Sequence, residues 1–158
     1  MILSRLLVPL GAALSLLIAA CGLAQTGPQS LPLGELVIES GGKQHRFAVE
    51  VAQTSDQRAT GLMFRTEMPA DRGMLFGYDG SQPVSMWMKN TFIPLDMLFI
   101  RADGRIMNIA EWTEPRSLRE VNSAGSVKAV LELNGGTAAR LGLKPGDQVR
   151  HPLFPAGG

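Results

Sequence analysis

Apolar and polar residues alternate along several short runs of the chain, which is the pattern of strands with one buried face. Residues 35–39 and 44–51 form one pair of such runs, and the glycine-rich turn between them predicts a hairpin. Residues 95–101 and 105–112 form a second pair, and Asp103-Gly104 between them is a strong hairpin signal. Further strands are predicted over residues 74–76, 84–88, 127–133 and 148–151.

Helical signals are few and short. Thr54 with Gln57 makes a capping box, which predicts a short helix that reaches Met63. Thr137 begins a single turn that Gly142 ends. Strands that follow strands without regular helical crossovers favour a β-rich α+β domain, a small and mostly antiparallel barrel or sandwich with about two short helices.

The first residues have the layout of an export signal. Arg5 precedes residues 6–20, a stretch without charge that is short for a membrane span. It ends in Ile18-Ala19-Ala20-Cys21-Gly22, which resembles the bacterial lipobox, in which the cysteine is acylated and becomes the mature N-terminus. We therefore predict a lipoprotein-type signal peptide over residues 1–20, a tether over 21–33, one globular domain over 34–152 and a tail over 153–158.

Lipidation of Cys21 would hold the protein on a membrane surface, in the periplasm or elsewhere in the cell envelope. The alternative is ordinary cleavage near Ala24, which would leave a soluble periplasmic protein. Cys21 is the single cysteine, so no disulfide can form within the chain and the domain relies on packing.

The 15 Lys and Arg residues include Arg5, so 14 remain after the leader against 14 Asp and Glu. This balance does not favour nucleic acid as a partner.

The sequence lacks the motifs of several common chemistries. It holds no glycine-rich phosphate loop, no HExxH and no GxSxG. His45 and His151 are far apart and have no nearby cysteine, so we predict no zinc site and no cofactor. Seven methionines lie between Met63 and Met107, and thioethers can bind Cu(I). Core packing is favoured for them, because strand alternation would place Trp87 opposite its methionine neighbours.

The segment from Trp87 to Asp96 is the candidate binding site. Alternation places Trp87 and Lys89 on one face, followed at once by Asn90. An indole ring beside an ammonium group and an amide can stack on a sugar or flat ring and hydrogen-bond its polar groups. Asp96 enters an apolar strand, where its carboxylate needs a cation or backbone donors, and Lys89 is the candidate cation. The alternative is structural, with Trp87 covering the end of the barrel, Asp96 capping a turn and Lys89 solvated.

Several motifs together resemble the uncharacterised prokaryotic family called domain of unknown function 192. They are Gly61–Arg65, Gly73–Phe76, Trp87–Thr91, Ile93–Met97, Ala129–Leu133 and Leu143–Asp147. The resemblance covers residues 35–151 and implies a compact, β-barrel-like fold in a family with many exported members. It implies no activity, cofactor or catalytic residue.

These observations leave several functions open. The favoured hypothesis is a noncatalytic envelope module that binds a small polar ligand or glycan around Trp87, Lys89, Asn90 and Asp96. An enzyme is the second, with Asp96 and Lys89 as an acid/base pair. A structural or assembly role, in which sheet edges bind protein partners, is the third. Cu(I) binding through methionines is the least favoured.

Overall fold

The computed structural model describes residues 27–154, so Cys21 and the leader lie outside the described residues. Within this range the chain forms nine strands and two short helices, which confirms the predicted β-rich α+β class. In chain order they are β1 (Leu33–Ser40), β2 (Lys43–Ala52), α1 (Ser55–Thr60), β3 (Arg72–Gln82), β4 (Ser85–Met86), β5 (Leu95–Ile100), β6 (Ile106–Thr113), β7 (Val121–Asn122), β8 (Val127–Asn134), α2 (Thr137–Leu141) and β9 (Gln148–Arg150). Neither helix of this part of the chain is long and apolar enough to cross a membrane.

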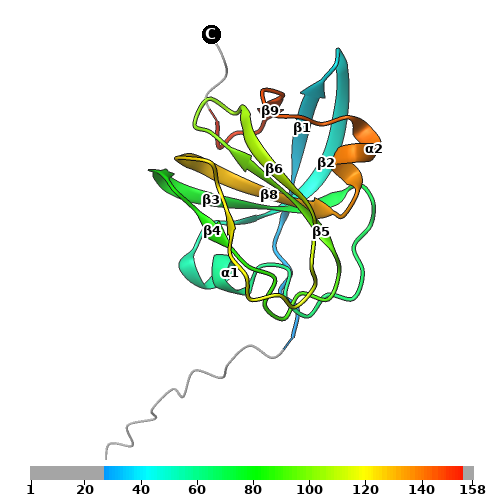
Figure 1. Cartoon of the computed structure of the whole chain (residues 1–158), viewed down its shortest axis with the longest axis vertical. Coiled ribbons are helices and arrows are strands. Elements are labelled where there is room, and N and C mark those ends of the chain that lie inside the picture. The colour runs from blue at the N-terminus through cyan, green and yellow to red at the C-terminus, as the bar shows by residue number, and fades with distance from the viewer. Residues whose placement is uncertain (1–26, 155–158) are drawn as a thin grey trace, which may run out of the picture.

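Seven strands form one curled sheet in the order β6-β5-β8-β3-β2-β1-β9 (Figure 1). Strands β2 and β3 are parallel, and the other neighbours are antiparallel. The N–H of Val149 donates to the carbonyl of Gly104 (2.8 Å), and the N–H of Ile106 donates to that of Asp147 (3.0 Å). These bonds join β9 to the start of β6, so the two edges of a half-barrel meet at one end. Strands β4 and β7 pair separately.

The inner face of the curled sheet carries the first hydrophobic core. Its side chains come from all seven strands, and α2 adds Ala138. Leu36, Val49, Leu131 and Val149 are among its fully buried members. Burial of this face follows directly from the period-two alternation of the strands.

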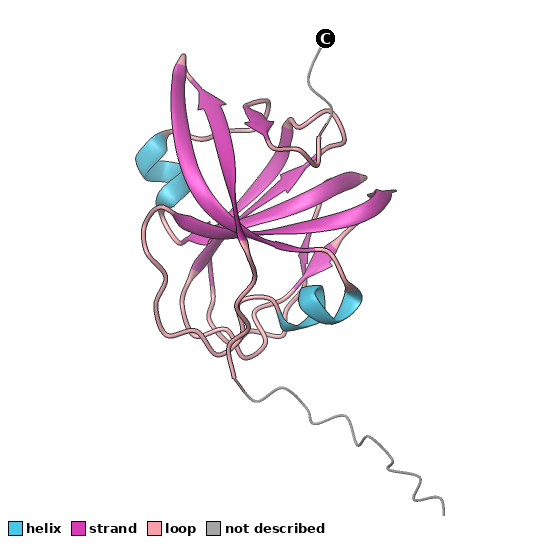
Figure 2. Cartoon of the chain, turned by 180° about the vertical axis from the view of Figure 1, so that it is seen from behind, coloured by secondary structure: helices cyan, strands magenta, loops and turns pink. Residues whose placement is uncertain are grey.

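A second core covers the outer face of β3, β5 and β8. The strands contribute Met74, Phe76, Met97, Phe99 and Val130, and the loops contribute Leu62, Met68, Val84, Met88 and Ile93. These loops gather at the end of the molecule where the described chain begins, at Gly27 (Figure 2). Because they fold over the sheet, the outer face of its central strands is shielded from water as well.

Candidate functional site

Asp96 is fully buried in β5, where backbone groups satisfy its carboxylate. Its Oδ1 accepts hydrogen bonds from the N–H groups of Trp112 (2.9 Å) and Gly136 (3.0 Å), and its Oδ2 accepts one from Ala138 (2.8 Å). Its chain neighbour Met97 belongs to the outer core, so Asp96 faces the inner side of the sheet. The carboxylate thus joins β5 to the end of β6 and the start of α2.

Trp87, Lys89 and Asn90 lie in the loop after β4. The predicted strand over 84–88 ends at Met86, so the alternation that would place Trp87 opposite Met86 does not apply. Trp87 is 49% exposed, and the Nζ of Lys89 lies 5.2 Å from the centre of its ring. The structure therefore brings Trp87 and Lys89 together on the outer side, while Asp96 lies across the sheet from them.

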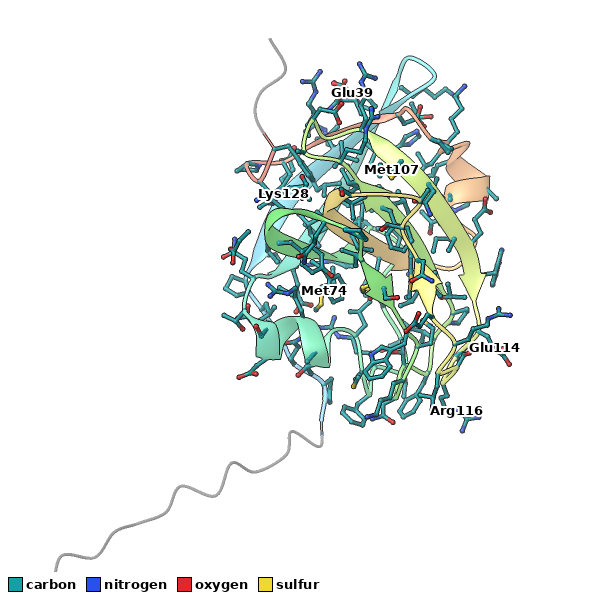
Figure 3. The ribbon with its side chains drawn as sticks, turned by 60° about the vertical axis from the view of Figure 1, so that its left-hand side comes forward. Glu39, Met74, Met107, Glu114, Arg116 and Lys128 are labelled. Atoms are coloured by element: carbon teal, nitrogen blue, oxygen red, sulfur yellow. The ribbon has the colours of Figure 1, made fainter. Side chains whose placement is uncertain are left out.

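Backbone hydrogen bonds hold this loop against its neighbours. The N–H of Phe64 donates to the carbonyl of Asn90 (2.8 Å), and the N–H of Arg116 donates to that of Thr91 (3.0 Å). Phe64, Asn90 and Arg116 all have left-handed backbone, with φ of 66°, 53° and 64°. Figure 3 shows Arg116 at this end of the molecule. Such conformations cost energy and persist where the surroundings fix them, so these loops form a defined surface.

Glu132 lies beneath that surface, in the middle of the sheet. Cross-strand pairing sets Glu50, Met74, Glu132 and Met97 in a row across β2, β3, β8 and β5. Glu132 is only 4% exposed, and none of the described residues donates a hydrogen bond to its carboxyl group. Burial raises the pKa of Glu132 from 4.5 to about 8, because the charged form loses its hydration. Glu132 therefore holds a proton at neutral pH.

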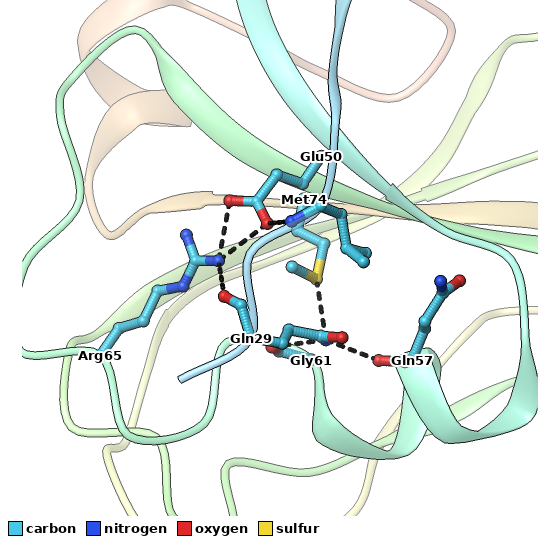
Figure 4. A network of polar contacts seen from close by, with 7 residues as sticks. Gln29, Glu50, Gln57, Gly61, Arg65 and Met74 are labelled. Carbon is cyan, nitrogen blue, oxygen red and sulfur yellow. Dashed lines mark hydrogen bonds and ion pairs between the residues drawn. The ribbon is translucent and has the colours of Figure 1, made fainter. Parts of the chain in front are cut away.

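Glu50, in the same row, is a buried carboxylate whose charge is compensated by a cation and a backbone donor (Figure 4). Arg65 pairs with it at 2.7 Å, and the N–H of Leu31 donates to it at 2.6 Å. Gln29 closes the network: its Nε2 donates to the carbonyl of Gly61 (2.9 Å) and lies 3.9 Å from the Sδ of Met74. The fold thus supplies one buried carboxylate with a cation and leaves the other, two strands away, without one.

A small pocket opens between Glu132 and the loop that carries Trp87. Its volume is about 20 Å³, which is room for one water molecule or a single ion. The residues that give it chemical character are Met63, Met86, Trp87, Lys89, Thr91 and Glu132. Lys89 belongs to the same lining, and no salt bridge joins its ammonium group to Glu132 among the described residues. The pocket combines an uncompensated acid, soft thioethers and an indole ring.

The sequence does not reveal Glu132, because residues 127–133 alternate as a strand with Glu132 on its polar face. Lys128, Val130 and Glu132 share that face, and Val130 belongs to the outer core. An apolar side chain between two charged ones is the one signal that this face is covered. The covering loops themselves come from distant parts of the chain.

Trp112 marks a second hollow, beside the end of β6. Its side chain is 62% exposed and its φ is 51°. Its backbone N–H donates a hydrogen bond to Asp96. A Cβ added at Gly136 would lie 2.6 Å from Cζ2 of the indole, so the ring packs directly on this glycine. The groove beside it has a volume of about 330 Å³ and is lined by residues that include Glu111, Glu114, Ser117, Arg119 and Glu120.

Metal donors of the usual kind are not grouped in the part of the chain that the structure describes: residues 27–154 contain no cluster of three His, Cys, Asp or Glu side chains that could hold an ion. Two residues with thioether sulfur, Met63 and Met86, line the same pocket as Glu132.

Comparison with known proteins adds a family and two solved structures. The model of the family DUF192, described as "Uncharacterized ACR", matches residues 36–151. A crystal structure from Sinorhizobium meliloti 1021, of a protein provisionally called a transcription regulator, is similar with 43% identity and a TM-score of 0.78, covering 81% of this chain and 100% of that one. A protein of unknown function from Novosphingobium aromaticivorans DSM 12444 is similar with 44% identity and a TM-score of 0.75, covering 77% and 86%. A search of curated proteins finds no match.

Proposed function

The chain belongs to the DUF192 family, and from this premise we propose that it is a noncatalytic envelope protein that binds one small ligand in the Glu132 pocket. The observation that carries the proposal is the buried carboxyl group of Glu132, which opens to a pocket yet has no partner among the described residues. An unpaired buried acid is costly, so such a group is a candidate for a binding site. Trp87 and Lys89 also line the pocket and supply a ring and a cation that a ligand can contact.

The ligand screen that tests this proposal uses Trp87 as its reporter. The chain contains two tryptophans, so the Trp112→Phe variant leaves Trp87 alone. We expect a ligand that enters the pocket to change Trp87 emission and raise the melting temperature, because it binds only the folded state. Glu132→Gln should abolish both responses, whereas Glu67→Gln, which changes an exposed glutamate, should leave them intact. Responses that survive Glu132→Gln would contradict the proposal, as would a screen of ions, metabolites and glycans without any response.

A glycan is the second candidate ligand. The groove beside Trp112 suits a glycan better than the Glu132 pocket does. A volume of about 20 Å³ cannot admit a sugar ring, whereas about 330 Å³ reaches the size of ordinary ligand pockets. An exposed indole next to carboxylates and an arginine can stack on a sugar and bind its hydroxyl groups. In the same screen, a glycan in this groove would alter the emission of Trp112 in a Trp87→Phe variant.

The envelope location rests on the leader and on Cys21. We propose that the signal peptide is removed and that acylated Cys21 holds the domain on a membrane surface. Mass spectrometry of the mature protein tests this directly. We expect an N-terminal Cys21 with attached acyl chains. An unmodified Cys21, or a chain that begins after it, would contradict the anchor, and the second result would favour a soluble periplasmic protein.

A further inference from the structure

We propose that two adjoining loops, residues 87–94 and 114–120, form a surface that lies against the membrane to which Cys21 is attached. The apolar side chains of this loop surface lie in the interfacial layer of the bilayer. This assignment rests on the proposed anchor and is independent of any ligand in the Glu132 pocket. Three features of the domain carry it: the exposed apolar side chains, the hydrogen bonds between their loops, and the end of the domain at which the chain begins.

Three of the five large apolar side chains that are exposed among the described residues lie on these two loops. Trp87 is 49% exposed, Phe92 46% and Leu118 66%. Each of the two aromatic residues is followed by a buried apolar neighbour, Met88 or Ile93, so the first loop supplies the outer core without them. Apolar side chains that the core does not use, gathered on adjoining loops, are typical of a surface that meets a membrane or a partner.

Hydrogen bonds and ring packing hold the loop surface in shape. The N–H of Met88 donates to the carbonyl of Ser117 (3.0 Å), which joins the first loop to the second. Phe92 packs edge-on against Phe64 of the loop after α1, with 6.4 Å between the ring centres. Because the surface is formed in advance, little conformational entropy is lost when it meets a bilayer.

The described chain begins at the same end of the domain as these loops (Figures 1 and 2). Gln29 fixes the N-terminal segment there. Its Nε2 donates to the carbonyl of Gly61 (2.9 Å), and its own carbonyl accepts a hydrogen bond from Nη2 of Arg65 (2.7 Å). Only seven residues separate Cys21 from Gln29 in the sequence. A link of a few residues has a short reach, so an acylated Cys21 brings this end of the domain to the membrane.

The chemistry of the loop surface suits the interfacial layer of a bilayer. Indole rings are enriched at this level, because they combine an apolar ring with a polar N–H. Nζ of Lys89 lies 5.2 Å from the ring centre of Trp87, and a long basic side chain can keep its charge among the headgroups. The exposed charged residues of the two loops are nearly balanced in sign: Lys89, Arg116, Arg119, Glu114 and Glu120. Apolar contact should therefore dominate over attraction to anionic lipid, and binding should depend little on salt.

Quenching by brominated lipid tests the loop surface on the mature, acylated protein in phosphatidylcholine vesicles. Trp112→Phe leaves Trp87 as the one tryptophan. We expect Trp87 emission to shift to shorter wavelength and to be quenched by bromine on the upper part of the acyl chains. The double variant Phe92→Asp, Leu118→Asp should lower the ratio of docked to undocked protein roughly 100-fold or more, and so remove the quenching.

The matched control is the double variant Gln44→Asp, Ala102→Asp, which places the same two charges on exposed positions of the β1–β2 and β5–β6 turns. Figure 3 shows Glu39, near the first of these turns, at the opposite end of the molecule from Arg116. This control should keep the quenching. Urea unfolding should show that both double variants are folded, because all four substitutions are at exposed positions.

The outcomes separate the loop surface from the anchor. Unquenched Trp87, or equal quenching in the two double variants, overturns the loop surface. Acylated protein that floats with the vesicles while Trp87 stays unquenched keeps the anchor and loses the surface. If mass spectrometry finds no acyl group, the anchor falls; quenching of that chain by added vesicles then upholds the surface alone, and no quenching overturns both. A shift of Trp87 emission that needs an envelope protein and not lipid assigns the surface to a protein partner and overturns the membrane proposal.

Discussion

Glu132→Gln should make the protein about 5 kcal/mol more stable than the wild type at pH 9, while the two proteins should be equally stable at pH 4. The folded state holds the Glu132 proton up to a pKa of about 8, whereas the unfolded chain releases it near 4.5. Between these values the unfolded chain binds fewer protons, so the free energy of unfolding decreases by about 1.4 kcal/mol per pH unit. Glutamine has no proton to lose, so this decrease is absent from the variant.

Urea unfolding over the pH range measures the difference, and Glu67→Gln is the matched control because its side chain is exposed. The control curve should follow the wild type at every pH. A constant difference between Glu132→Gln and the wild type would show that Glu132 ionises normally in the folded protein. The combination of higher stability and lost ligand response in one variant would identify Glu132 as a residue retained at a cost in stability.

Asp96→Ala should destabilise the protein by roughly 3 to 5 kcal/mol, because it leaves one buried and two part-buried N–H groups without an acceptor. Those groups belong to Trp112, Gly136 and Ala138, which lie on two segments that the carboxylate holds together. Asp96→Asn keeps one oxygen acceptor and should therefore lose less stability than Asp96→Ala. The free energy of unfolding in urea gives both values. Trp112 emission should also shift, because the backbone N–H of Trp112 loses its acceptor.

Asp79→Ala is the control for this prediction, since Asp79 is exposed at the end of β3 and its side chain makes no hydrogen bond with the described residues. Its effect should stay within about 0.5 kcal/mol. If Asp96→Ala were no more harmful than Asp79→Ala, the backbone bonds to Asp96 would not be important for the fold.

Local signals in the sequence predict the hairpins well. Residues 35–51 form β1 and β2 around a glycine turn, and residues 95–112 form β5 and β6 around Asp103-Gly104, because turn chemistry acts between neighbours in the chain. The parallel pairing of β2 with β3 was not predicted, since it depends on a connection through α1 and a long loop. Strand β7 was also missed, because two residues carry no periodicity.

The sequence shows that Asp96 needs partners but not which ones. A carboxylate in an apolar strand requires a cation or backbone donors, and the donors come from residues 16 to 42 positions further along the chain. Trp87 and Lys89 do lie together, but in a loop, so strand alternation is not the reason. Glu132 could not be found, because its burial depends on loops that only the folded chain brings over β8.

The ionisation of Glu132 is the most direct test of this account. Glutamate labelled with ¹³C at the carboxyl carbon gives one NMR signal per side chain, and the signal that is missing in Glu132→Gln identifies the residue. We predict that this signal titrates with a pKa of about 8 in the folded protein, because burial disfavours the carboxylate. A titration near 4.5 would show that Glu132 is solvated or paired, and would contradict the assignment of this pocket as the binding site.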